Sequence, residues 1–158
     1  MNLTGSLSKE RVNILDEKLL TQIRFLKKYL NLLKDMAQKS KKEYLEDFIY
    51  KGAVERYLQL AIECCINIGN RIISLEQFKY DLTPPETYAE VFEKLQKIGL
   101  IEENLSTKLK TMTQFRNKLV HVYWEIDDAV VYDILQNNLK DIEEFLKIAI
   151  KYVQSEGK

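Results

Sequence analysis

Long stretches with a helical apolar period, rarely interrupted by turn residues, are the most constraining feature of this sequence. Only five glycines and two prolines occur in 158 residues, and the two prolines are adjacent. A multi-stranded sheet needs turn residues at short intervals, and this chain has too few of them. We therefore expect an all-α fold.

The first half of the chain predicts two long helices. Apolar residues recur every three or four positions from Val12 to Leu33, which indicates an amphipathic helix of roughly 30 residues. Ser40 and Glu43 have the spacing of a capping box, so a second helix is expected from there to about Phe78. Because the two helices nearly abut, they should form an antiparallel hairpin. The side chains expected to point inward from the second helix are Tyr44, Phe48, Ala53, Tyr57, Leu60, Ala61, Cys64, Ile68 and Ile72.

A short helix is expected next. Thr83 and Glu86 form a second candidate capping box, with Pro84 at the first helical position, where its missing N–H is harmless. Gly99 should end this helix after Ile98.

Two further helices complete the predicted bundle. One should run from about Glu102 to near Trp124, and the last should begin after an N-cap at Asp127. No internal repeat or low-complexity linker divides the chain. We therefore predict one domain, residues 1–158, folded as an antiparallel four-helix bundle with one additional short helix.

Composition excludes several classes of site. The 24 basic and 24 acidic residues cancel, so net charge does not indicate a nucleic-acid or membrane partner. His121 is the only histidine, which rules out a three-histidine zinc site and a Cys2His2 finger. Cys64 and Cys65 are adjacent and lack the spacing of metal ligands, so we expect reduced core residues and no metal site. A reaction that needs two histidines would need a second copy of the chain.

The sequence also shows no recognisable signal peptide or membrane-spanning segment. The first 20 residues lack a basic segment followed by an apolar core, and no apolar run reaches about 18 residues. We expect a cytoplasmic protein without a membrane partner.

Arg116 occupies an unusual position in the fourth long segment. At 100° per residue it lies about 20° from Leu105, in the middle of the apolar stripe. A buried guanidinium must pair with a carboxylate, bind backbone carbonyls or line a cavity that receives an anion. Glu63 on the second helix is a possible internal partner. A purely structural ion pair and an anion site both remain open at this point.

His121 lies on a different side of the same helix. It is about 140° from Arg116 and only about 40° from Asn117, so His121 and Asn117 share a face. In one regular helix, Arg116 and His121 cannot converge on one small group, whereas two crossing copies could supply them from two directions. Such a set suits metal-independent cleavage of RNA, with histidine as general acid or base and arginine stabilising the charge on the phosphorane.

The run FRNKLVHVY, residues 115–123, resembles the Arg-x4-His-x-Tyr signature of HepT-like HEPN proteins, and Asn117 fits the polar place after the arginine. Three more segments look like the family in the same order. They are residues 61–74, residues 84–99 and residues 126–132.

This resemblance implies an all-α homodimer with Arg116 and His121 of both protomers in one cleft, and Asn117 as an orienting residue. Family members are typically ribonuclease toxins of toxin–antitoxin pairs, here of a type II or type VII kind, so RNA is the expected substrate. Their partner is an MntA-type nucleotidyltransferase antitoxin, which would transfer AMP to Tyr123. Lys118 would contact RNA, and no cofactor is implied. This chain has no nucleotidyltransferase signature, so it would be the acceptor of AMP.

Two other functions fit the same sequence. The chain could be a non-catalytic helical subunit that binds a nucleotide or docks a nucleotidyltransferase. It could also be a structural bundle in which the motif is a coincidence. If replacing His121 abolishes RNA cleavage, the chain is a ribonuclease, and both of these alternatives are excluded.

Overall fold

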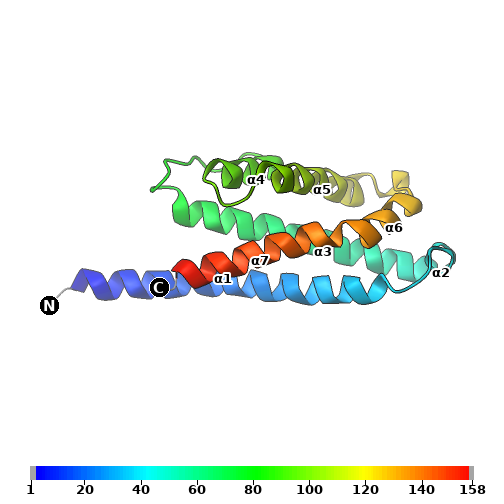
Figure 1. The fold of residues 1–158 in the computed structure, drawn as a ribbon, viewed down its shortest axis with the longest axis horizontal. Helices are drawn as coiled ribbons and strands as arrows, with labels where there is room; N and C mark the ends of the chain where they lie inside the picture. Colours follow the sequence, from blue (N-terminus) through cyan, green and yellow to red (C-terminus); the bar gives the residue numbers. More distant parts are fainter. Residues whose placement is uncertain (1–2, 157–158) are drawn as a thin grey trace.

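The computed structural model describes residues 3–156, with side chains for residues 17–155, and every regular element in that range is helical. Figure 1 shows long helices stacked side by side, which confirms the all-α prediction. The elements are α1 (Leu3–Met36), α2 (Lys41–Glu46), α3 (Phe48–Glu76), α4 (Tyr88–Lys97), α5 (Glu103–His121), the 3-10 helix η1 (Tyr123–Glu125), α6 (Asp128–Asn137) and α7 (Leu139–Glu156).

Helix α3 is the centre of the bundle, because α1, α4, α5 and α7 all pack against it. α1 and α3 form the predicted antiparallel hairpin, and α7 crosses in front of both (Figure 1). α4 and α5 pair with each other on the other side of α3. With α2–α3 and α6–α7 each counted as one broken helix, this is the predicted arrangement of four main helices and one short helix.

The second predicted helix is broken at Asp47, where the prediction of a continuous helix was wrong. The capping box at Ser40 is present, with Glu43 N 3.2 Å from Ser40 Oγ and Ser40 N 3.2 Å from Glu43 Oε2. Asp47 is extended (φ −104°, ψ 96°) and its Oδ1 accepts a bond of 3.0 Å from Tyr50 N, so it caps a new helix. Because the helix restarts here, Phe48 is 85% exposed instead of pointing inward.

The short helix α4 begins four residues later than predicted. Thr87, not Thr83, is its N-cap, and Thr87 Oγ1 accepts a hydrogen bond of 3.2 Å from Glu90 N. Consecutive prolines explain the shift, since a residue that precedes proline is disfavoured in the α region and Pro84 precedes Pro85. Gly99 follows the end of α4 with φ +79°, as expected of a glycine that ends a helix.

The last predicted helix is also divided. Asp127 is the N-cap of α6, as predicted, and its Oδ1 accepts a bond of 2.9 Å from Ala129 N. α6 ends at Asn137, and α7 starts at Leu139 after a one-residue junction at Asn138. The Asn138 side chain donates to Asp141 Oδ2 at 3.3 Å, which stabilises the first turn of α7.

Tight packing of α3 on α4 depends on Gly69. A Cβ built on Gly69 would overlap Val91 Cγ1 of α4, so only glycine allows this approach.

Cys64 and Cys65 on the same helix are free and buried, as predicted for core thiols. Burial raises the pKa of the Cys64 thiol to about 11, which keeps it protonated and unreactive. None of the helices in residues 3–156 is long and apolar enough to span a membrane.

Candidate active site

The motif residues lie on the last turns of α5 and just beyond its end. Val122 leaves the helical conformation (φ −135°, ψ 44°), so α5 ends at His121. His121 is exposed, and Tyr123 and Trp124 in η1 are each 67% exposed. The two aromatic rings meet edge to face at 5.4 Å. An exposed histidine and an exposed tyrosine hydroxyl are therefore presented at one end of the helix.

Arg116 is half-buried against α3. Its Nη2 and Nε donate to Glu63 Oε1 at 2.7 Å and 3.1 Å, and its Nη1 donates to Asn117 Oδ1 at 3.3 Å. The guanidinium carbon lies 5.2 Å from the centre of the Tyr88 ring, within reach of a cation–π interaction. These contacts use three of the five N–H donors of Arg116 and leave one on each terminal nitrogen.

Glu63 is a carboxylate held in place for Arg116. Gln59 Nε2 donates to the same Oε1 at 3.0 Å. Partial burial raises the pKa of Glu63, but the hydrogen bonds from Gln59 and Arg116, together with the positive charge of Arg116, outweigh it and lower the pKa overall. Of the partners that the sequence left open for Arg116, the structure selects the carboxylate.

Arg116 also lines a cavity, so the ion pair does not exclude an anion site. The cavity has a volume of about 270 Å³, and its lining is mostly polar. Gln59 and Tyr88 were not singled out from the sequence, because only the packing of α4 on α5 and the turn of α3 bring them to Arg116. The lining residues are Glu63, Ile66, Asn67, Asn70, Tyr88 and Arg116.

The structure does not bring Arg116 and His121 together within one protomer. Arg116 is bound to Glu63, and among the described residues His121 makes no hydrogen bond or ion pair. The Asn117 side chain bonds to Arg116, although the helical wheel places it on the face of His121. Lys118 is exposed on α5 and forms no ion pair within the described part of the chain.

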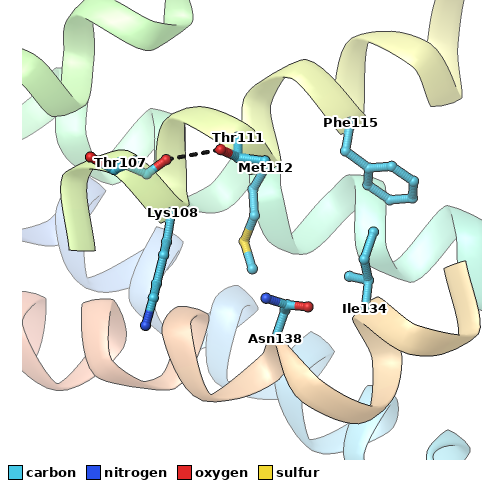
Figure 2. Close-up of a pocket in the computed structure, with 7 residues that line it drawn as sticks. All are labelled: Thr107, Lys108, Thr111, Met112, Phe115, Ile134 and Asn138. Atoms are coloured by element: carbon cyan, nitrogen blue, oxygen red, sulfur yellow. Dashed lines mark hydrogen bonds between the residues drawn. The ribbon is translucent and has the colours of Figure 1, made fainter. Parts of the chain in front are cut away.

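Another cavity lies on a different side of α5, and Arg116, Asn117, His121 and Tyr123 do not line it. Figure 2 shows Met112, Phe115 and Ile134 pointing into it, with Asn138 at the α6–α7 junction. It has a volume of about 200 Å³. Within the range whose side chains are described, no group of three or more His, Cys, Asp or Glu residues could hold a metal ion. The candidate chemistry is therefore carried by the end of α5 and the cavity at Arg116.

Comparison with solved structures identifies a protein with a similar helical bundle. A solved structure of the tri-AMPylated HEPN toxin of Shewanella oneidensis in complex with its MNT antitoxin superposes with a TM-score of 0.74. The two chains are 28% identical, over 85% of this chain and 97% of the other. This chain thus has the helical-bundle fold of that HEPN toxin.

Sequence comparison defines the family. The family model for HepT-like ribonucleases matches residues 26–149. The "mRNA nuclease HepT" of Shewanella oneidensis is 31% identical over 136 residues, which are 86% of this chain and 96% of that protein. The "tRNA nuclease HepT" of Aphanizomenon flos-aquae is 30% identical over 112 residues, 71% of this chain and 74% of that protein. The chain belongs to the HepT-like ribonuclease family, and it is a ribonuclease.

Proposed function

We propose that this protein is a toxin that cleaves RNA without a metal, at a site formed by two protomers and controlled by a nucleotidyltransferase antitoxin. The observation that carries the proposal is the separation of the motif residues. Arg116 is fixed to α3 by Glu63, whereas His121 is exposed at the helix end and makes no hydrogen bond or ion pair with the described residues. A homodimer with the two α5 ends facing each other would combine an arginine from one protomer with a histidine from the other.

The chemistry follows from these two side chains. The neutral imidazole of one His121 accepts the proton of a ribose 2′-hydroxyl, and the 2′-oxygen attacks the adjacent phosphorus. The bond from phosphorus to the 5′-oxygen breaks, and the protonated imidazole of the second His121 supplies a proton to that oxygen. The products are a 2′,3′-cyclic phosphate and a 5′-hydroxyl. The two unused N–H donors of Arg116 stabilise the negative charge of the phosphorane.

Asn117 and Lys118 have supporting roles in this proposal. Asn117 accepts a hydrogen bond from Arg116 Nη1, so it orients the guanidinium rather than reacting. Lys118 is exposed beside the site and contacts the RNA backbone as a point charge. Neither residue reads a base, so RNA selectivity has another origin.

Control by an antitoxin is the last part of the proposal. The Shewanella oneidensis structure contains an AMPylated HEPN toxin and its MNT antitoxin. Tyr123 is two residues after His121 and 67% exposed, so a transferase can reach its hydroxyl. The Tyr123 oxygen would attack the α-phosphorus of ATP, with pyrophosphate leaving. The attached AMP would add negative charge beside His121 and repel RNA.

Replacing His121 by alanine tests the catalytic claim. We expect the variant to lose RNA cleavage and growth inhibition while keeping its melting temperature, because an exposed side chain without hydrogen bonds in the described structure contributes little to stability. Lys151→Ala, an exposed substitution on α7, is the control and should remain active. A His121→Ala variant that still cleaves RNA would refute the mechanism. If the parent protein cleaves no RNA and the His121→Ala variant still binds the nucleotidyltransferase normally, the chain is a non-catalytic docking subunit.

A further inference from the structure

A further cavity, whose exposed lining is mostly carbon, shares Asn67 with the cavity at Arg116. It lies between α1 and α3 and has a volume of about 310 Å³. Because Asn67 lines both, the two cavities are neighbours along α3. The residues that line this cavity between α1 and α3 are Lys18, Thr21, Gln22, Asn67 and Arg71.

This cavity contains two cations, Lys18 and Arg71, that form no ion pair with a described carboxylate. Among the described side chains, no carboxylate forms an ion pair with Lys18 or Arg71, whereas Arg116 in the neighbouring cavity is paired with Glu63. Arg71 Nε is buried and has no hydrogen-bond partner among the described residues. An unsatisfied buried donor costs free energy that a bound acceptor would recover. The cavity therefore has the charge and the free donors of a site for an anion.

The remaining lining is suited to a sugar or a base. Asn67 Nδ2 lies 3.4 Å from Gln22 Oε1, so two side-chain amides form one wall. Each amide has further donor and acceptor capacity for a 2′-hydroxyl or a base edge. These neutral groups lie between the cavity at Arg116 and the two cations.

The position of Arg71 relative to the motif gives the site a direction. Glu63, Asn67 and Arg71 are four residues apart on one face of α3, so Arg71 is about 12 Å along the helix from Glu63. Helix α3 runs antiparallel to α5 (Figure 1), and Lys51 near the start of α3 contacts Asp128 just after the end of α5. Arg71 thus lies on the side of Arg116 that is away from His121.

We propose that Lys18 and Arg71 bind a backbone phosphate of single-stranded RNA next to the phosphate that is cleaved, with the amides of Gln22 and Asn67 contacting the nucleotide between them. This inference rests on the proposed ribonuclease function. The strand follows α3 from the motif at the end of α5 toward α1. The site binds RNA by charge and leaves the chemical step to Arg116 and His121.

The test compares two double variants with the same change in charge. Lys18→Gln with Arg71→Gln removes the proposed site. Lys27→Gln with Lys147→Gln is the control, because Lys27 lies half a turn around α1 from Lys18 and Lys147 is exposed on α7. Cleavage is measured with a dinucleotide, which contains only the scissile phosphate, and with a longer single-stranded RNA. Binding of the longer RNA is measured over a range of salt concentrations in the His121→Ala background.

We expect the Lys18/Arg71 variant to cleave the dinucleotide like the parent protein. Its KM for the longer RNA should rise about threefold or more with kcat unchanged, and the slope of log affinity against log salt should become shallower by about 0.7 for the lost phosphate contact. If Lys18 and Arg71 had only a structural role, the substitutions would change the cleavage of the dinucleotide and of the longer RNA equally. The control variant should match the parent throughout.

Three results would overturn the inference. A Lys18/Arg71 variant that matches the control in KM and salt slope, while the parent cleaves RNA, removes the subsite and leaves the proposed function intact. A Lys18/Arg71 variant that becomes monomeric in light scattering, while the control stays dimeric, shows that this face is a contact between subunits. A parent protein that neither binds nor cleaves RNA refutes the proposed function, and the subsite with it.

Discussion

Arg116 and Glu63 are joined by two hydrogen bonds to one carboxylate oxygen, 2.7 Å from Nη2 and 3.1 Å from Nε. The pair connects the motif helix α5 to the central helix α3. It fixes the guanidinium while leaving two of its N–H donors for a phosphate. The ion pair is therefore both a structural contact and the device that orients the arginine.

Glu63→Gln should destabilise the fold by about 1–2 kcal/mol at neutral pH, between the values for exposed and buried pairs. Because the pKa of Glu63 is lowered in the folded state, its contribution is present above the ordinary glutamate pKa and is lost as the pH falls through the lowered value. Urea unfolding of both proteins from pH 7 to pH 3 measures this. The difference in unfolding free energy should shrink toward acid pH. A difference that stays constant over this range would contradict the assignment, and Glu144→Gln on the exposed side of α7 is the control.

Two glycines of α3 should respond oppositely to alanine. Gly69→Ala should destabilise the fold by about 1–3 kcal/mol, because the added Cβ overlaps Val91 and forces α4 away from α3. Gly52→Ala should stabilise it by up to about 1 kcal/mol, because nothing lies within 4 Å of the added Cβ and alanine favours the helix. Thermal or urea unfolding measures both. Equal effects of the two substitutions would show that the α3–α4 contact is not as close as described.

Tyr123→Phe should prevent AMPylation without affecting cleavage. The phenyl ring keeps the edge-to-face contact with Trp124 but lacks the oxygen that, in the proposed reaction, would attack ATP. Intact mass after co-expression with the nucleotidyltransferase should show AMP adducts on the parent and none on the variant, whose growth inhibition should persist. Tyr80→Phe, at another exposed tyrosine, is the control. Adducts that remain on the Tyr123→Phe protein would place the modification elsewhere.

Most of the bundle could be predicted because its helices are long and strongly periodic. The position of Arg116 in the apolar stripe showed that the guanidinium needs a partner or an anion, and Glu63 was already a possible partner, but only the structure shows that the two residues pair. The helix breaks were missed because Asp47 and Asn138 lie inside periodic sequence, and only tertiary packing decides that the chain bends there. Arg71 was not recognised as a candidate, since its lack of a partner depends on how α1 packs against α3.

The most direct test of the central claim is the activity of a mixed dimer. Parent and His121→Ala proteins carrying different tags are co-expressed, and the heterodimer is purified through both tags. The His121→Ala homodimer should be inactive. The heterodimer has one intact histidine, whereas the proposed reaction uses two, one as base and one as acid, so its RNA cleavage should fall far below half of the parent activity. A heterodimer with half of the parent activity, or a protein that is strictly monomeric, would contradict a site shared between two copies of the chain.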